Sequence, residues 1–267
     1  MPLQKTEAVV LKSQRSGETS KIVTLFTPKL GKLRVVAKGS RGMKSRFFGT
    51  LEPLNHISIV YYFKETREYQ YLSQADIIHA HEKIKSDLKK YALANVLCEL
   101  VERTELPQPN PYLFQILIDA LAGINKSQGQ LDGYLIWFLL RFLKINGFEP
   151  DVSRCRQCGA VSAEGVVYFS LPDGSYACGN CTPPLPNRVT VSAATILYLR
   201  QLKAISIKHV ESIVRPPFAE AEMLLFAFLN YHIEEAKYLK TVKFLRQIQV
   251  ADLDHPADQP DQHAKLD

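Results

Sequence analysis

The chain has 267 residues, of which 46% are hydrophobic and 22% charged, and it carries a net charge of +6. No apolar run has the length of a signal peptide or a membrane span, since the densest, LIWFLL at 135–140, is far too short. We therefore expect a soluble intracellular protein with one large domain or two to three small ones, and no membrane partner.

The positive charge is concentrated in the first 50 residues, which contain eleven Lys or Arg and two acids. A one-sided distribution creates a directed field, and polyanions are its natural partners. The other end has the opposite character. Residues 249–267 contain five Asp, one Lys and no apolar periodicity, which predicts a disordered acidic tail.

Residues 1–80 predict a β-domain. Five short runs rich in β-branched residues are separated by Gly, Ser, Pro or polar turns, at 8–12, 21–27, 32–38, 54–63 and 68–77. In the fourth run Ile57, Ile59 and Tyr61 share one face, as expected of a half-buried strand. Five strands without an intervening helix indicate a small barrel, because closure removes exposed sheet edges.

Residues 81–149 and 189–248 have the helical period and predict two parts of one helical domain. In the first part Asn110 is suited to cap a helix whose first residue is Pro111. The segment 131–148 is apolar nearly all round, which predicts a buried central helix. In the second part we expect helices over 192–205 and 218–248. The HAHE segment at 79–82, at the join between barrel and helices, is expected to be exposed.

A four-cysteine cluster falls in residues 150–188, a segment poor in aliphatic residues. Two C-x2-C pairs, separated by 19 residues, fit the spacing of a zinc site better than a redox pair, and they consist of Cys155, Cys158, Cys178 and Cys181. Four thiolates saturate a tetrahedral Zn²⁺ and leave no position for water. The cluster therefore predicts a structural zinc module whose metal supplies the folding energy.

The basic stretch 31–49 contains six cations and no acid. Strand parity directs Leu33, Val35 and Ala37 into the barrel and the cations of the same run outward, and a flexible Gly/Ser loop follows. We predict nucleic-acid binding by Lys32, Arg34, Lys38, Arg41, Lys44 and Arg46. The alternative is a solvated basic face, although solubility alone is better served by mixed signs. Tyr62, which points outward by parity, is the candidate for stacking on unpaired bases.

The sequence contains no P-loop, H-E-x-x-H or G-x-S-x-G motif and no carboxylate cluster of the kind that nucleases use. We therefore predict that the protein is not an enzyme. Two non-enzymatic alternatives stay open beside DNA binding. One is an RNA-binding module of translation or tRNA processing, and the other is a zinc-containing protein-interaction scaffold.

The order of a basic barrel, helices, a four-cysteine module and further helices resembles a bacterial recombination mediator family, DNA repair protein RecO. Three stretches carry the resemblance: EAVVLKSQRSGETSKIVTLFTPKLGKLRVVAKGSRGMKSRFFGTLEP at 7–53, FLLRFLKINGFEPDVSRCRQCG at 138–159 and FSLPDGSYACGNC at 169–181. Together with the helical spacing they cover most of residues 1–248.

The resemblance implies an α+β protein with an N-terminal OB-fold barrel that binds single- and double-stranded DNA, and a mainly helical remainder that carries the zinc module. It implies annealing of complementary strands and, with the partner RecR, help for the RecA recombinase in replacing single-strand-binding protein. In some members a helical groove takes the acidic C-terminal tail of single-strand-binding protein. The zinc ligands map onto the four cysteines and the DNA contacts onto the six cations, with Arg15 and Lys21 as further candidates. A bacterial cytoplasmic location at the nucleoid follows.

Overall fold

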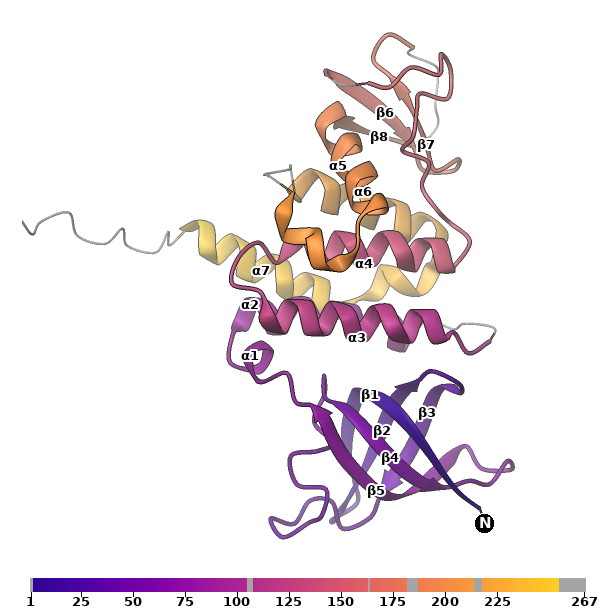
Figure 1. The fold of residues 1–267 in the computed structure, drawn as a ribbon, viewed down its shortest axis with the longest axis vertical. Helices are drawn as coiled ribbons and strands as arrows, with labels where there is room; N and C mark the ends of the chain where they lie inside the picture. The colour runs from indigo at the N-terminus through magenta and orange to yellow at the C-terminus, as the bar shows by residue number, and fades with distance from the viewer. Residues whose placement is uncertain (1, 105–107, 163, 182–186, 214–217, 255–267) are drawn as a thin grey trace, which may run out of the picture.

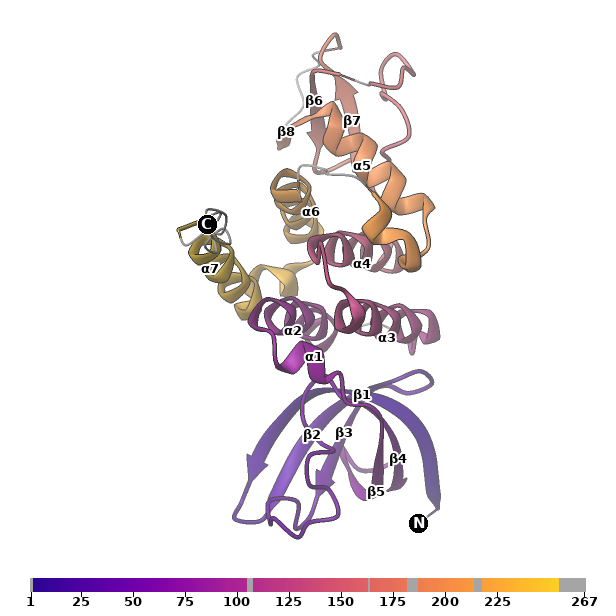
Figure 2. The ribbon, with the colours of Figure 1, turned by 60° about the vertical axis from the view of Figure 1, so that its left-hand side comes forward.

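The protein is described here by a computed structural model, which covers residues 2–104, 108–162, 164–181, 187–213 and 218–254. The molecule is elongated, with a β-barrel at one end, a small β-sheet at the other and helices between them (Figures 1 and 2). None of the helices in the described ranges has the length and apolar character that crossing a membrane requires.

The predicted five-stranded barrel is confirmed. Its strands are β1 (Leu3–Ser16), β2 (Ser20–Thr27), β3 (Gly31–Ala37), β4 (His56–Tyr62) and β5 (Tyr69–His79). They close in the order β1-β2-β3-β5-β4, with β3 and β5 parallel and the other neighbours antiparallel. This is the strand order of an OB-fold, the five-stranded Greek-key barrel that the resemblance implied.

Strand parity is as predicted from the apolar alternation. Val35 and Ala37 are buried in the barrel core, and Leu33 packs against it. On β4, Tyr61 is 1% exposed and Tyr62 is 40% exposed, since successive side chains point to opposite faces. The barrel therefore presents the polar residues of β3 and the Tyr62 ring on its outer surface.

The connection 38–55 between β3 and β4 is anchored, although the sequence predicted a flexible loop over its first half. The Arg41 amide donates to the Thr19 carbonyl in the β1–β2 turn at 3.1 Å. Further along, Phe47 and Leu51 are buried in the barrel core, and Leu54 is buried in the helical core. The apolar residues after the basic stretch thus tie this segment to both parts of the molecule.

The helical part contains two groups of helices. The first comprises α1 (Glu82–Lys85), α2 (Leu88–Arg103), α3 (Pro111–Lys126) and α4 (Asp132–Ile145), and the second comprises α5 (Ala193–Ala204), η1 (Ile207–Ser212), α6 (Phe218–His232), η2 (Glu234–Tyr238) and α7 (Lys240–Asp254). Asn110 caps α3 as predicted, because its side chain accepts from the Leu113 amide at 2.8 Å. The predicted central helix α4 is buried from Gly133 to Leu140.

The single helix predicted over 218–248 is wrong, since the chain breaks between α6 and α7. At the end of α6 the His232 ring stacks on Phe148, with ring centroids 4.4 Å apart, and its Nε2 bonds the Leu171 carbonyl at 2.8 Å. A new helix then begins where the Glu99 carboxylate accepts from the Lys240 and Thr241 amides. Contacts with other segments therefore override the continuous helical period.

The barrel is fixed to the helices by a mixed apolar and polar contact. Phe26 of β2 lies against Phe114 of α3, with ring centroids 6.1 Å apart. At the join, His81 is 6% exposed and its Nδ1 bonds the Leu54 carbonyl at 2.8 Å. The expectation that this part of the HAHE segment is exposed is therefore wrong, because the join itself is packed.

The small sheet at the far end consists of β6 (Val166–Ser170), β7 (Ser175–Cys178) and β8 (Arg188–Ser192), antiparallel in the order β7-β6-β8. The cysteines lie in and beside this sheet. The zinc module was predicted to end at residue 188, but β8 extends the sheet to Ser192. The disordered tail was predicted to begin at residue 249, but the helix α7 continues to Asp254. The rest of that tail, residues 255–267, lies outside the described part of the chain.

Candidate metal centre and nucleic-acid interface

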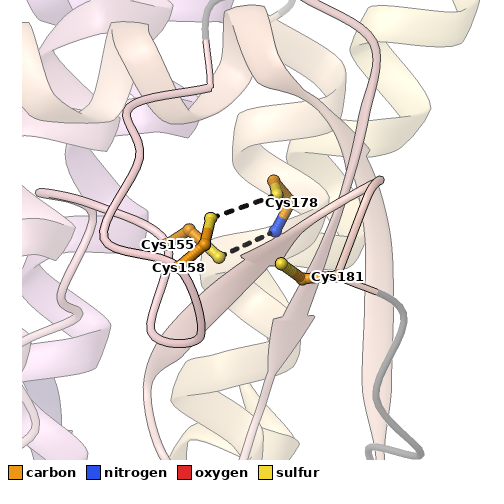
Figure 3. A group of neighbouring side chains, drawn as sticks. All are labelled: Cys155, Cys158, Cys178 and Cys181. Atoms are coloured by element: carbon orange, nitrogen blue, oxygen red, sulfur yellow. Dashed lines mark hydrogen bonds between the residues drawn. The ribbon is translucent and has the colours of Figure 1, made fainter.

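The fold gathers the four predicted metal ligands at one place. The Sγ atoms of Cys155, Cys158, Cys178 and Cys181 all lie within 4.8 Å of one another (Figure 3). Cys178 is the last residue of β7, and Cys181 follows it. The first pair, Cys155 and Cys158, lies in the loop that precedes β6. The spacing in sequence thus becomes a compact thiol cluster.

Each C-x2-C pair closes through backbone hydrogen bonds. The Gly159 amide donates to the Cys155 carbonyl, and the Cys181 amide donates to the Cys178 carbonyl, both at 2.9 Å. Gly159 adopts a φ of +71°, a conformation that side chains other than that of glycine rarely take. At Gly179 a Cβ would lie 2.9 Å from the Val166 carbonyl oxygen. Gly159 therefore serves its turn, and Gly179 allows the second pair to lie close to the backbone of β6.

The cluster fits a tetrahedral metal ion. With metal–sulfur bonds of about 2.3 Å, a tetrahedron has sulfur–sulfur edges of about 3.8 Å. Cys158 Sγ and Cys178 Sγ are 3.8 Å apart. Burial raises the pKa of Cys155, but the amides of Cys158, Cys178 and Gln157 donate to its sulfur and lower the pKa to about 6. Cys155 therefore favours the thiolate form that binds metals, and the four sulfurs could hold one ion.

The predicted cations do not all face one groove. Lys32 is the second residue of β3 and Lys38 directly follows its end, and six residues of strand span about 20 Å. Lys32 Nζ donates to the carbonyls of Glu102 and Thr104, at 2.9 and 3.2 Å, where α2 ends. Lys32 thus joins the barrel to the helices, and the remaining cations lie on the barrel itself.

Arg34 and Arg41 have protein partners on the barrel surface. Arg34 Nη1 lies 2.6 Å from Glu68 Oε1, and this carboxylate raises the pKa of Arg34. Arg41 Nη1 donates to the Gly17 and Glu18 carbonyls in the β1–β2 turn, at 3.0 and 2.6 Å. Arg34 is thus paired with an acid, whereas the partners of Arg41 are uncharged carbonyls.

The other cations lie toward the end of β3 and along the connection that follows it. Lys44 and Arg46 are exposed, and the Arg46 guanidinium lies over the Phe47 ring at 4.9 Å. Of the two further candidates from the resemblance, Arg15 is exposed, and Lys21 forms an ion pair with Glu52 at 3.0 Å. Of the six cations predicted from the basic stretch, Lys38, Arg41, Lys44 and Arg46 form no ion pair with an acid among the described residues, and neither does Arg15.

Two residues that the sequence did not single out lie beside these cations. Lys38 Nζ is 4.7 Å from the centroid of the Tyr71 ring, and Arg67 Cζ is 5.0 Å from the same centroid. Tyr71 is directly opposite Tyr62 in the β4–β5 ladder. Alternation along β5 alone would have placed Tyr71 on the outer face, but its neighbours depend on how β3, β4 and β5 pair.

Comparisons with known proteins match the barrel and most of the helical part. The model of the family "Recombination protein O N terminal" matches residues 1–81, and that of "Recombination protein O C terminal" matches residues 85–241. The DNA repair protein RecO of Bacillus subtilis is 30% identical over 250 residues, which are 92% of this chain and 95% of that protein. The proteins of the same name from Salinibacter ruber and Caldanaerobacter subterraneus are each 31% identical, over 92% and 88% of this chain and 95% and 94% of their own lengths.

Proposed function

Since this chain belongs to the RecO family of DNA repair proteins, we propose that it is a non-enzymatic recombination mediator that binds single- and double-stranded DNA and anneals complementary strands. The observation that carries the proposal is the group of cations at the end of β3 and in the following connection, Lys38, Arg41, Lys44 and Arg46. They lie on an OB-fold barrel beside exposed aromatic rings.

The physical basis of annealing would be charge neutralisation. Two complementary strands repel each other through their phosphates, and cations held on a rigid barrel lower that repulsion and release counterions. The exposed ring of Tyr62 adds a surface on which an unpaired base can stack, and such a contact is worth about 1–3 kcal/mol per base. Such binding contacts the phosphate backbone and the faces of the bases, which all sequences share, so it does not depend on the base sequence.

We assign the four-cysteine cluster to a structural Zn²⁺. The cluster has four sulfur donors, which complete a tetrahedral coordination sphere and leave no site for a substrate. Bound there, the ion would supply folding energy to the β6–β8 sheet, whose segment is poor in aliphatic residues. The sheet lies at the far end of the molecule from the barrel, which supports a structural role (Figure 1).

The proposed setting is the bacterial cytoplasm, at the nucleoid. There the chain would act with RecR to help load the RecA recombinase onto DNA coated by single-strand-binding protein. The helical part would take the C-terminal tail of single-strand-binding protein. The case for these partners rests on family membership.

Competition binding tests the proposal against the two alternatives. A labelled single strand is bound and then displaced by DNA duplex, by unlabelled single-stranded DNA or by structured RNA. We expect single-stranded DNA to compete best and the affinity to fall with salt, with a slope of about −0.7 per phosphate contacted. Strong preference for structured RNA would favour the translation or tRNA-processing alternative, and absence of any nucleic-acid affinity would favour the scaffold.

Two charge-matched variants sharpen the experiment. Replacing Lys38, Arg41, Lys44 and Arg46 by Ala should flatten the salt slope by about 0.7 for each phosphate that the protein no longer neutralises. The control replaces four exposed lysines of the helical part by Ala: Lys83, Lys126, Lys208 and Lys243. Equal effects of the two variants would mean that net charge alone governs binding and would contradict the barrel assignment.

A further inference from the structure

Two cations from different parts of the chain are held over one aromatic ring. Lys38 follows β3 and Arg67 belongs to the β4–β5 loop, yet both lie over the ring of Tyr71, at 4.7 and 5.0 Å from its centroid. Their charged groups are therefore within about 10 Å of each other. A tyrosine face attracts each cation by about 0.5–1 kcal/mol at an exposed site.

The strand register places Tyr71 and Lys38 together. In the parallel β3–β5 pair, Tyr71 is opposite Val36, two residues before Lys38 on the same side of the strand. The Tyr71 ring is not part of the barrel core, since it is half-buried on the outer face of the barrel. Tyr61, on the neighbouring strand, is buried in the interior instead. The Tyr71 ring thus lies where it can contact cations and solvent together.

A buried side chain holds the backbone at Arg67. Gln70, only 4% exposed, accepts from the Lys64 amide at 2.8 Å and donates to the carbonyls of Lys64 and Arg67 at 3.0 and 2.7 Å. These three bonds set the shape of the β4–β5 loop before any ligand binds. A neutral ring and a preformed loop therefore place two cationic groups within about 10 Å of each other on the barrel surface, an arrangement that can contact more than one phosphate of a bound strand.

We infer that Tyr71 is a positioning residue that holds Lys38 and Arg67 as a two-point clamp on the phosphates of a nucleic-acid single strand. The inference rests on the proposed function and extends it, because Arg67 lies outside the basic stretch and Tyr71 is uncharged. Tyr62 lies beside Tyr71 across the β4–β5 ladder, so a strand held by the clamp has an exposed ring next to it for its bases. That neighbour makes a single strand the fitting ligand.

The test measures binding of a labelled oligothymidylate as a function of salt for the full chain and two variants. Tyr71→Leu keeps the net charge and an apolar side chain but removes the ring, whereas Tyr71→Phe keeps the ring. We expect Tyr71→Leu to flatten the salt slope by about 0.7–1.4, the value for one to two phosphates that are no longer neutralised, and to weaken binding up to about 25-fold at 0.1 M salt. Tyr71→Phe should match the wild type.

An unchanged slope in a folded Tyr71→Leu variant would overturn the inference and leave the proposed function intact, whereas a wild-type chain that binds no DNA would overturn both. A merely structural role of the ring would lower the melting temperature without altering the slope. If Tyr71→Leu does not fold, the test moves to Lys38→Ala and Arg67→Ala. Each should flatten the slope by about 0.7, and no change in either would contradict the clamp.

Discussion

Arg34 and Glu68 form an ion pair across the outer face of the barrel, with Nη1 2.6 Å from Oε1 and side chains that are 53% and 64% exposed. The pair joins β3 to the β4–β5 loop, beside the proposed clamp. A phosphate oxygen that binds Arg34 Nη1 would have to displace this carboxylate. The positive charge of Arg34 is thus partly offset by an acid of the protein itself.

Glu68→Gln should therefore strengthen DNA binding. An exposed ion pair is worth about 0.2–1 kcal/mol, which corresponds to an affinity about 1.5- to 5-fold higher when the competitor is removed. The salt slope should steepen by about 0.7 as Arg34 gains a phosphate. The matched control is Glu65→Gln in the same loop, because Glu65 forms no ion pair with any described residue. An equal gain in both variants would assign the effect to net charge.

Lys32→Ala should cost stability and spare DNA binding. Its ammonium donates to two carbonyls at the end of α2, and a hydrogen bond from a charged group contributes about 1.5–3 kcal/mol. Chemical denaturation should show a loss of that order, and the salt slope of DNA binding should stay as in the wild type. Lys44→Ala should give the reverse pattern. A flatter slope in the Lys32 variant would return this residue to the DNA-binding set.

Removal of the metal should unfold the β6–β8 sheet and leave the barrel folded. We expect one zinc per chain by elemental analysis and its loss in Cys158→Ser, because three thiolates bind the ion far more weakly than four. Cys98→Ala is the control, since Cys98 is buried in α2 and burial raises its pKa to about 12. Full zinc content in the Cys158 variant would argue against a four-sulfur site.

Stability should fall as the pH is lowered through the range in which histidines titrate. Burial, with like-charge contributions from His79, His56 and Lys85, lowers the pKa of His81 below its ordinary value of 6.5. The unfolded chain therefore binds the proton more readily, so this stability is present above about pH 6.5 and is lost on acidification. Burial lowers the pKa of His56 in the same way.

His81→Asn should reduce this pH dependence, measured as the free energy of unfolding between pH 7.5 and 5.5. Asparagine tolerates the left-handed backbone of position 81, where φ is 50°, and its amide can donate to the Leu54 carbonyl. Part of the dependence should remain because His56 is still present. The same decline in the variant and the wild type would exclude His81 as its source.

Local patterns were enough to predict the barrel, the outward direction of Tyr62 and the thiol cluster, because each follows from a period or a spacing. Alternation along β4 separates Tyr61 from Tyr62 without knowledge of the partner strands. A glycine directly follows the second cysteine of the first pair and the first cysteine of the second pair, and the local backbone needs both. These features are determined by residues a few positions apart.

Features that depend on distant residues could not be predicted in this way. The strand pattern predicts Lys32 as an outward-facing cation. Its hydrogen bonds to the end of α2 go to carbonyls that are 70 and 72 residues away in the sequence, which no local pattern indicates. The contact of Lys38 and Arg67 with Tyr71 requires the parallel β3–β5 register. The break after α6 is set by Leu171 and Phe148, which no helical period within 218–248 encodes.

The central claim is strand annealing by a cationic barrel, and its most direct test is the annealing rate of complementary DNA strands precoated with single-strand-binding protein. No nucleotide is added, and the chain is compared with the variant in which Lys38, Arg41, Lys44 and Arg46 are replaced by Ala. The wild-type chain should accelerate annealing and the variant should do so much less, with the difference between them fading as salt rises. An annealing rate that the wild-type chain leaves unchanged would contradict the central claim.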